Sequence, residues 1–220
     1  MSGVRFYRQQ LYCVDGQRLA VCANDAYKDF VPATNISWNE ACVWLNAYSE
    51  YKGYEPVYYR GNAVWKDDTS TNSTFKWDQT KNGYRLPTEC EWEFAAGGGS
   101  EAEHDKYIYA GSNTIEEVAW YNSNSGYEAH KVGTKKANAL GLYDMSGNAA
   151  EYCFDCYTSF GNGELTNPIH FTGNYRIVRG GNLGSYYCKH FNRDATGYIR
   201  GTCSGIDIKY CGIRVARNAD

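Results

Sequence analysis

Residues 83–96 read Gly-Tyr-Arg-Leu-Pro-Thr-Glu-Cys-Glu-Trp-Glu-Phe-Ala-Ala, a pattern typical of a capped helix. Thr88 and Glu91 form a capping box, in which each side chain accepts a hydrogen bond from the other residue's backbone N–H. Apolar residues then recur at helical spacing as far as Ala96. Residues 97–99 are all glycine and follow the helix instead of preceding it, so we interpret them as its C-terminal cap and not as a phosphate-binding loop.

A second helix is predicted upstream by the same signals. Ser37 and Glu40 form a capping box, and apolar residues at helical spacing continue to about Tyr51. Beyond residue 100 the chain has almost no helical periodicity and is rich in Gly, Asn, Ser and Tyr. Two helices with an irregular, β-rich and loop-rich half indicate an α+β fold. Because no linker or repeat divides the chain, we expect a single domain over residues 1–220.

Short strands are expected on both sides of the upstream helix. Residues 4–31 alternate apolar and polar groups in short runs, with a hairpin turn at Asp15-Gly16. Residues 54–66 predict another hairpin, which turns at Gly61-Asn62. The polar stretch 67–82 is expected to be a long surface loop.

Composition excludes several classes of function. The chain has 22 basic and 25 acidic residues and no basic run longer than Lys135-Lys136, so it lacks the positive patch that nucleic acids require. No stretch of about 18 apolar residues is present to span a membrane. Of nine cysteines we expect most to be free thiols, with Cys153 and Cys156 acting as small buried apolar residues instead of a metal or redox pair.

Four motifs in a fixed order carry a family resemblance. They are residues 83–96, Gly-Leu-Tyr-Asp-Met-Ser-Gly-Asn-Ala-Ala-Glu-Tyr at 141–152, Val-Arg-Gly-Gly at 178–181 and Gly-Ile-Arg-Val-Ala-Arg at 212–217. Together they resemble the formylglycine-generating-enzyme, or sulfatase-modifying-factor, family. The resemblance implies that family's C-type lectin-like fold for the whole chain.

The enzymes of this family use two cysteines that follow the Arg-Gly-Gly motif, bind copper through their thiolates and oxidise a substrate cysteine. Here Ser185 and His190 stand at those positions, and a gap in the alignment brings only Cys188 onto one of them. One thiolate cannot form a two-sulfur copper site, so we expect a binding protein without a cofactor and not an enzyme. A copper- and thiol-dependent oxidase using Cys188 or Cys203, and a structural surface protein, are the alternatives.

Residues 179–217 resemble the C-terminal cassettes of variable proteins that are diversified by retroelements, in which adenine-specific mutagenesis rewrites Asn-type codons. Such cassettes open with Arg-Gly-Gly-x-Trp and close with Gly-Phe-Arg-Val, and here Leu183 replaces the Trp and Ile213 the Phe. Residues 184–210 contain no Glu, Gln, Met or Trp, four residue types that an Asn codon cannot reach by changes at its adenines. An ordinary solvated loop is the alternative interpretation.

This second resemblance implies a scaffold at 1–181, a variable binding segment at 182–211 and a closing strand at 212–217. Tyr, of which the chain has 21, supplies rigid contact area in recognition surfaces. We expect the ligand to be an unknown protein or surface molecule and not a nucleic acid. We expect the protein to be a monomer without a direct membrane span. Its expected location is the bacterial cell surface or elsewhere outside the cytoplasm, with the targeting segment absent from this chain. The candidate binding residues are Ser185, Tyr186, Tyr187, Cys188, His190, Asn192, Asp194, Thr196, Tyr198, Ile199, Thr202, Cys203, Ser204, Asp207 and Tyr210. All of them except Cys188, Thr196, Ile199 and Cys203 are expected to cluster on one exposed face.

The family resemblance also assigns roles to a few charged residues. Residues 147–151 resemble a segment that holds a structural calcium through backbone carbonyls and a carboxylate, so Glu151 is a candidate calcium ligand. A buried glutamate satisfied by protein groups is the alternative. Arg85, Glu89 and Glu91 correspond to residues that pack and cap a helix, and we assign them no chemistry.

Overall fold

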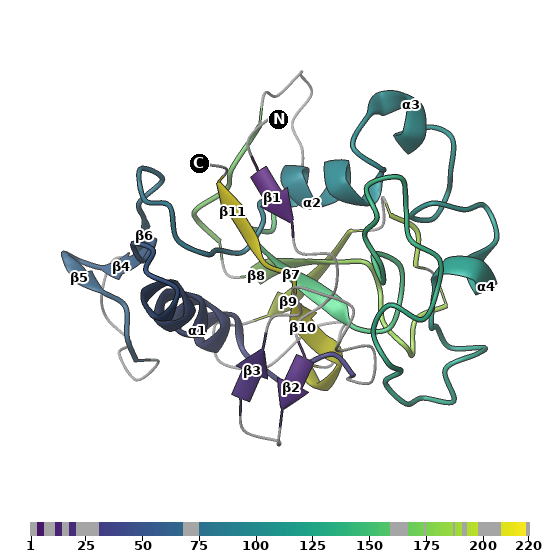
Figure 1. Ribbon diagram of the computed structural model, residues 1–220, viewed down its shortest axis with the longest axis horizontal. Helices are drawn as coiled ribbons and strands as arrows, with labels where there is room; N and C mark the ends of the chain where they lie inside the picture. Colours follow the sequence, from purple (N-terminus) through teal and green to yellow (C-terminus); the bar gives the residue numbers. More distant parts are fainter. Residues whose placement is uncertain are drawn as a thin grey trace.

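The largest sheet has the strand order β10-β7-β8-β9 and lies near the centre of the molecule (Figure 1). β7 (Ala150–Cys156) is antiparallel to β8 (Tyr175–Arg179), β8 is antiparallel to β9 (Arg193–Gly197), and β10 (Cys211–Ile213) is parallel to β7. Every residue of β7 is buried, so both faces of this strand are covered. The computed structural model describes residues 31–67, 75–158, 167–173, 175–186, 188–190 and 208–218, and the strands at 4–6, 12–14, 18–20 and 193–197.

Both predicted helices are confirmed, with their caps. In α1 (Trp38–Tyr51) the Ser37 side chain accepts from the Glu40 N–H, and the Glu40 carboxylate accepts from the Ser37 N–H. α2 (Glu89–Ala96) begins with the same reciprocal pair, Thr88 and Glu91, and its C-cap is Gly97. Two single-turn helices, α3 (Glu101–His104) and α4 (Ile115–Val118), were not anticipated, because four residues are too few to show a period.

The smaller sheets agree with the expected hairpins and correct one loop. β2 (Tyr12–Val14) pairs with β3 (Arg18–Ala20), and β4 (Tyr58–Arg60) pairs with β5 (Ala63–Val64) across the predicted turn. The expectation of one continuous loop over 67–82 is wrong, because β6 (Phe75–Trp77) pairs with β4 and contributes aromatic rings to the core. β1 (Val4–Phe6) pairs with β11 (Ala216–Asn218), which joins the two ends of the chain.

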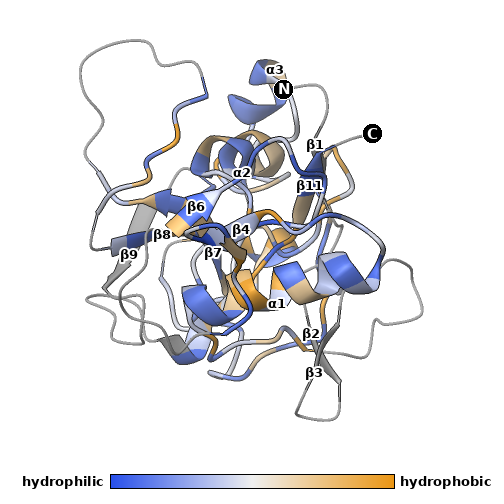
Figure 2. Ribbon diagram, turned by 90° about the vertical axis from the view of Figure 1, so that its left-hand side faces the viewer, coloured by the Kyte–Doolittle hydropathy of each residue, from blue (hydrophilic) through white to orange (hydrophobic). Residues whose placement is uncertain are grey.

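Aromatic packing holds α1 against the sheet. Trp38 is buried, its ring centroid lies 5.2 Å from that of Phe75 and 5.9 Å from that of Phe154, and its Nε1 donates to the Cys153 carbonyl at 3.0 Å. The donor satisfies the one polar atom of an otherwise apolar side chain. The ribbon of α1 alternates between hydrophobic and hydrophilic residues, as expected of a helix that covers a core on one side (Figure 2).

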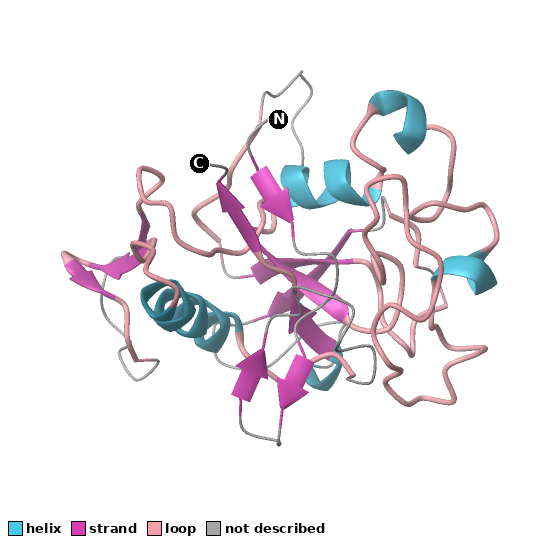
Figure 3. Cartoon of the chain, viewed as in Figure 1, coloured by secondary structure: helices cyan, strands magenta, loops and turns pink. Residues whose placement is uncertain are grey.

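Loops dominate the part of the molecule that carries α3 and α4 (Figure 3). The segment expected to be one closing strand, 212–217, contains parts of two strands, β10 and β11, with Arg214 between them. A short 3₁₀ helix, η2 (Ile208–Tyr210), leads directly into β10. The candidate variable segment therefore begins after β8, includes β9 and ends at η2 and the first residue of β10.

Candidate functional site

The loop at residues 120–130 holds the start of the candidate variable segment through backbone atoms. The Ser125 hydroxyl donates to the Leu183 carbonyl at 2.6 Å, and the Asn122 side-chain amide approaches the Gly184 carbonyl at 3.4 Å. The Asn122 N–H donates to the Ser185 carbonyl at 3.1 Å. Three consecutive carbonyls of the segment are thus fixed by residues outside it. These contacts do not depend on which side chains the segment carries.

The exposed side chain at this end of the segment is Tyr186, with 69% of its surface accessible. It follows a tight turn in which the Gly184 N–H donates to Asn182 Oδ1 at 2.8 Å, and the Asn182 N–H donates to Ser185 Oγ at 3.0 Å. Tyr127, in the supporting loop, is also exposed, and its hydroxyl accepts from the Asn122 amide at 2.7 Å. The turn and the loop together therefore present aromatic rings to solvent.

Cys188 and His190 do not share this exposure, so the expectation of an exposed face is wrong for His190. Cys188 is buried in a small apolar cluster with Val118 and Ala119. His190 is 2% exposed, and its Nε2 lies 2.8 Å from the Tyr107 carbonyl. Burial lowers the pKa of His190, because the cationic form loses hydration. Both residues anchor the segment to the scaffold.

The other candidate residues lie at separate parts of the sheet or outside the described residues. β9, at one edge, places Asp194 opposite Val178 and Thr196 opposite Arg176. The half-buried Tyr210 precedes β10, at the other edge, so β7 and β8 separate the two strands. Tyr187, Asn192, Tyr198, Ile199, Thr202, Cys203, Ser204 and Asp207 lie outside the described residues.

Arg179, from the Arg-Gly-Gly motif, connects this segment to α2. Its buried guanidinium donates to Glu89 at 2.7 Å, to Glu93, and to the His190 carbonyl at 2.8 Å. The carboxylates of Glu93 and Glu89 raise the pKa of Arg179 above its usual value in spite of burial, which acts in the opposite direction. The structural role expected of Glu89 is confirmed, as is that of Arg85, which pairs with Glu91 at 2.6 Å.

The carboxylate of Glu151 is already engaged by protein groups. Arg214 donates to both of its oxygens, at 2.8 and 2.9 Å, and Trp92 Nε1 donates to Oε2 at 2.7 Å. The Asn148 amide, in the same motif, is bonded in both directions to the His130 backbone. This geometry fits a satisfied buried glutamate, and the side chains do not fit the calcium site that the family resemblance suggested.

The cysteines of the sheet are buried, as expected. Cys153 and Cys156 have at most 1% exposure and are free thiols, and Cys156 Sγ lies 3.5 Å from the Phe171 carbonyl. Burial raises the pKa of both thiols. The thiolate is the reactive and metal-binding form of cysteine. Burial disfavours that form, and both side chains are packed in the core.

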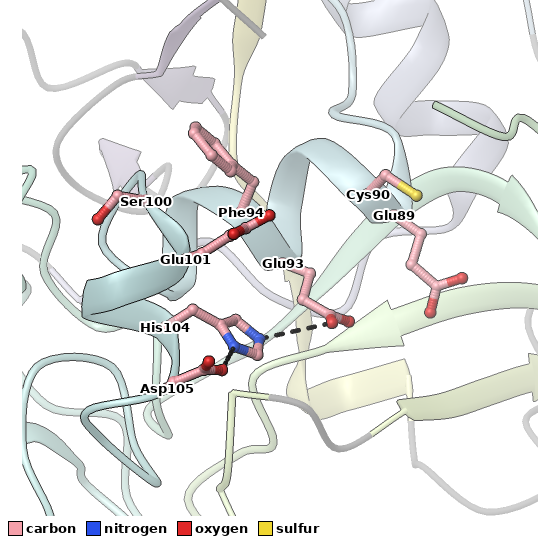
Figure 4. A pocket seen from close by; sticks show the side chains of 8 residues that line it. All are labelled: Glu89, Cys90, Glu93, Phe94, Ser100, Glu101, His104 and Asp105. Carbon is pink, nitrogen blue, oxygen red and sulfur yellow. Dashed lines mark hydrogen bonds and ion pairs between the residues drawn. The ribbon is translucent and has the colours of Figure 1, made fainter. Parts of the chain in front are cut away.

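A pocket lies between α2 and α3 (Figure 4). Its volume is about 490 Å³, and its lining residues are Glu89, Cys90, Glu93, Phe94, Ser100, Glu101, His104 and Asp105. The His104 ring lies edge-on to the ring of His190, with centroids 4.5 Å apart. Sequence reasoning missed this pocket, because α3 had no detectable period and Glu89 was expected only to pack and cap α2.

The fold is α+β and is the C-type lectin-like fold of the formylglycine-generating-enzyme type. Residues 9–219 match the sulfatase-modifying factor enzyme 1-like domain, and the chain belongs to this family. Within the described part of the chain, none of the helices combines the length and the hydropathy of a transmembrane span.

Three relatives place the chain within the family. The structure of Treponema denticola variable protein 1 is 31% identical, with a TM-score of 0.72 over 85% of this chain and 71% of that one, which confirms the predicted likeness to a variable protein. The chaperone protein LppX of Paenibacillus barcinonensis is 34% identical in an alignment of 172 positions that covers 68% of this chain and 58% of LppX. The formylglycine-generating enzyme of Streptomyces coelicolor is 30% identical in an alignment of 155 positions that covers 63% of this chain and 48% of the enzyme. The chain thus spans about half the length of these two curated relatives.

Proposed function

We propose that this chain is a ligand-binding protein that carries a hypervariable C-terminal site, residues 182–211, generated by a diversity-generating retroelement on a non-catalytic scaffold of the formylglycine-generating type. The observation that carries the proposal is the support of the Leu183, Gly184 and Ser185 carbonyls by Asn122 and Ser125. A segment whose side chains vary needs a backbone position that does not depend on them. Loops on a rigid scaffold meet this need.

The residues at the family's cysteine positions support a role without catalysis. Ser185 is part of a local turn and His190 is buried, so neither supplies a thiolate for copper. Cys188, the displaced candidate, is buried among apolar side chains. The residues present therefore do not fit a two-thiolate copper site, and we derive no oxidative step for this chain.

The ligand is proposed to be a protein or another surface molecule. The chain is proposed to bind it as a monomer, at the bacterial cell surface or elsewhere outside the cytoplasm. The exposed rings of Tyr186 and Tyr127 support a protein ligand, since Tyr gives large contact area at low entropic cost. The similarity to a treponemal variable protein supports the same role. Protease treatment of intact cells and size-exclusion chromatography test the location and the monomeric state.

The neighbouring DNA provides the sharpest test of this function. We expect a near-copy of the codons for residues 182–211 that differs only at adenines, beside a reverse-transcriptase gene. A locus with neither feature returns the segment to an ordinary loop. Copper-dependent turnover of a cysteine-containing sulfatase peptide by the purified chain would instead establish the alternative function, a copper- and thiol-dependent oxidase.

A further inference from the structure

We propose that the pocket between α2 and α3 binds a primary alkylammonium group, of the kind carried by a lysine side chain or a polyamine. The pocket lies outside residues 182–211, so this proposal does not depend on a variable site. Its volume of about 490 Å³ falls within the range of small-molecule sites. A short alkyl chain with a charged end fits within it.

The charge of the lining selects a cation. Four of the eight lining residues are carboxylates, and none is Lys or Arg. Arg179 pairs with Glu89 and Glu93 and balances part of their charge. In the described part of the chain, Glu101 and Asp105, both from the α3 side, have no lysine or arginine partner, so the negative charge of the pocket exceeds the positive charge around it.

The apolar part of the lining suits an alkyl chain. Phe94 is half-buried, and an ammonium group near an aromatic face gains cation–π attraction in addition to the attraction of carboxylates. Cys90 also lines the pocket, and its pKa is raised to about 11, chiefly by burial and then by Asp155, Glu89 and Glu93. At neutral pH this residue is therefore an uncharged thiol beside a negative potential.

The pocket presents carboxylates from two directions, one from α2 and one from the end of α3. Glu93, from α2, and His104, from α3, point toward one another, with Oε1 and Nε2 3.7 Å apart (Figure 4). Asp105 lies 3.1 Å from the other ring nitrogen of His104. An ammonium group, which has three donors, can thus meet carboxylates that come from both helices.

The test is a titration with n-butylammonium and with 1,5-diaminopentane, in which the NMR chemical shift of the His104 imidazole is monitored. The imidazole signal is assigned by its absence from the spectrum of a His104→Gln variant. We expect a saturable shift with both amines. Butyrate and n-butanol, matched in size, are expected to produce none. Equal shifts from n-butanol, or no saturation by either amine, overturn the proposal.

The variant Glu101→Gln/Asp105→Asn removes two charges from the pocket and is expected to weaken amine binding about tenfold or more. Glu50→Gln/Glu55→Gln is the matched control, because it removes the same charge from exposed pairs with Lys66 and Lys81. Equal weakening in both variants means unspecific attraction and rejects the site. Spermidine represents a polyamine and N-acetyl-lysine methylamide represents a lysine side chain. The compound that binds more tightly identifies the source of the amine.

Discussion

Arg214 and Glu151 form an ion pair in which neither side chain is exposed, with Nη2 and Oε1 2.8 Å apart. Glu151 belongs to β7, and Arg214 follows β10 at the exit of the candidate variable segment. Arg214 also donates to the Tyr143 carbonyl at 2.8 Å. The pair therefore fixes the end of the segment to the central sheet, as Asn122 and Ser125 fix its beginning.

Replacing Glu151 by Ala is expected to destabilise the chain by about 3–5 kcal/mol, because it leaves a buried guanidinium without its counter-charge. Urea denaturation measures the loss. Glu50→Ala is the control, since Glu50 forms an exposed pair with Lys66 that is worth less than about 1 kcal/mol. Equal and small losses in the two variants would contradict a structural role for the buried pair.

The same geometry makes a prediction about metal. Because Arg214 and Trp92 already occupy the Glu151 oxygens, we expect neither excess calcium nor its removal with a chelator to change the Tm. Thermal unfolding in calcium, and then in EGTA, measures this. A rise in Tm with calcium that Glu151→Gln abolishes would restore the calcium site that the family resemblance suggested.

The support of the variable segment predicts a contrast between two substitutions. Asn122→Ala removes the side-chain bonds to Tyr127 and Gly184 and is expected to cost about 1 kcal/mol of stability. Tyr186→Ala, at an exposed position, is expected to change stability by less than about 0.5 kcal/mol. Chemical denaturation of both variants tests the contrast. A larger loss from Tyr186→Ala shows that the segment supports the fold and is not free to vary.

Sequence reasoning found the features of this fold that depend on neighbours along the chain. Thr88 and Glu91, or the turn at Gly61, act within a few residues, so their spacing predicts the structure. β6 was missed because only its aromatic residues, within a polar stretch, mark it as part of the core. The burial of His190 was missed because its partner carbonyl, from Tyr107, is distant in sequence. The pocket is formed by residues 89–105, which are neighbours in sequence, and it was missed because the four residues of α3 show no helical period.

Asp144 predicts a pH dependence of stability. Burial raises its pKa from 3.8 to about 6, against the lowering effects of the Gly133 N–H and Arg214. Between these two values the folded state binds more protons than the unfolded state, so this group's contribution to stability is fully present below about pH 4 and is lost as the pH rises through about 6.

The Asp144→Asn variant removes this titration. Asn keeps an oxygen for the Gly133 N–H and tolerates the positive φ of 56° at this position. Urea denaturation at several pH values between 4 and 7 is expected to show the native chain losing stability relative to the variant, by an amount on the order of 2 kcal/mol. If the difference in stability between the native chain and the variant stays constant over this range, Asp144 has the same pKa in the folded and the unfolded state. That result would contradict the prediction that Asp144 causes the pH dependence.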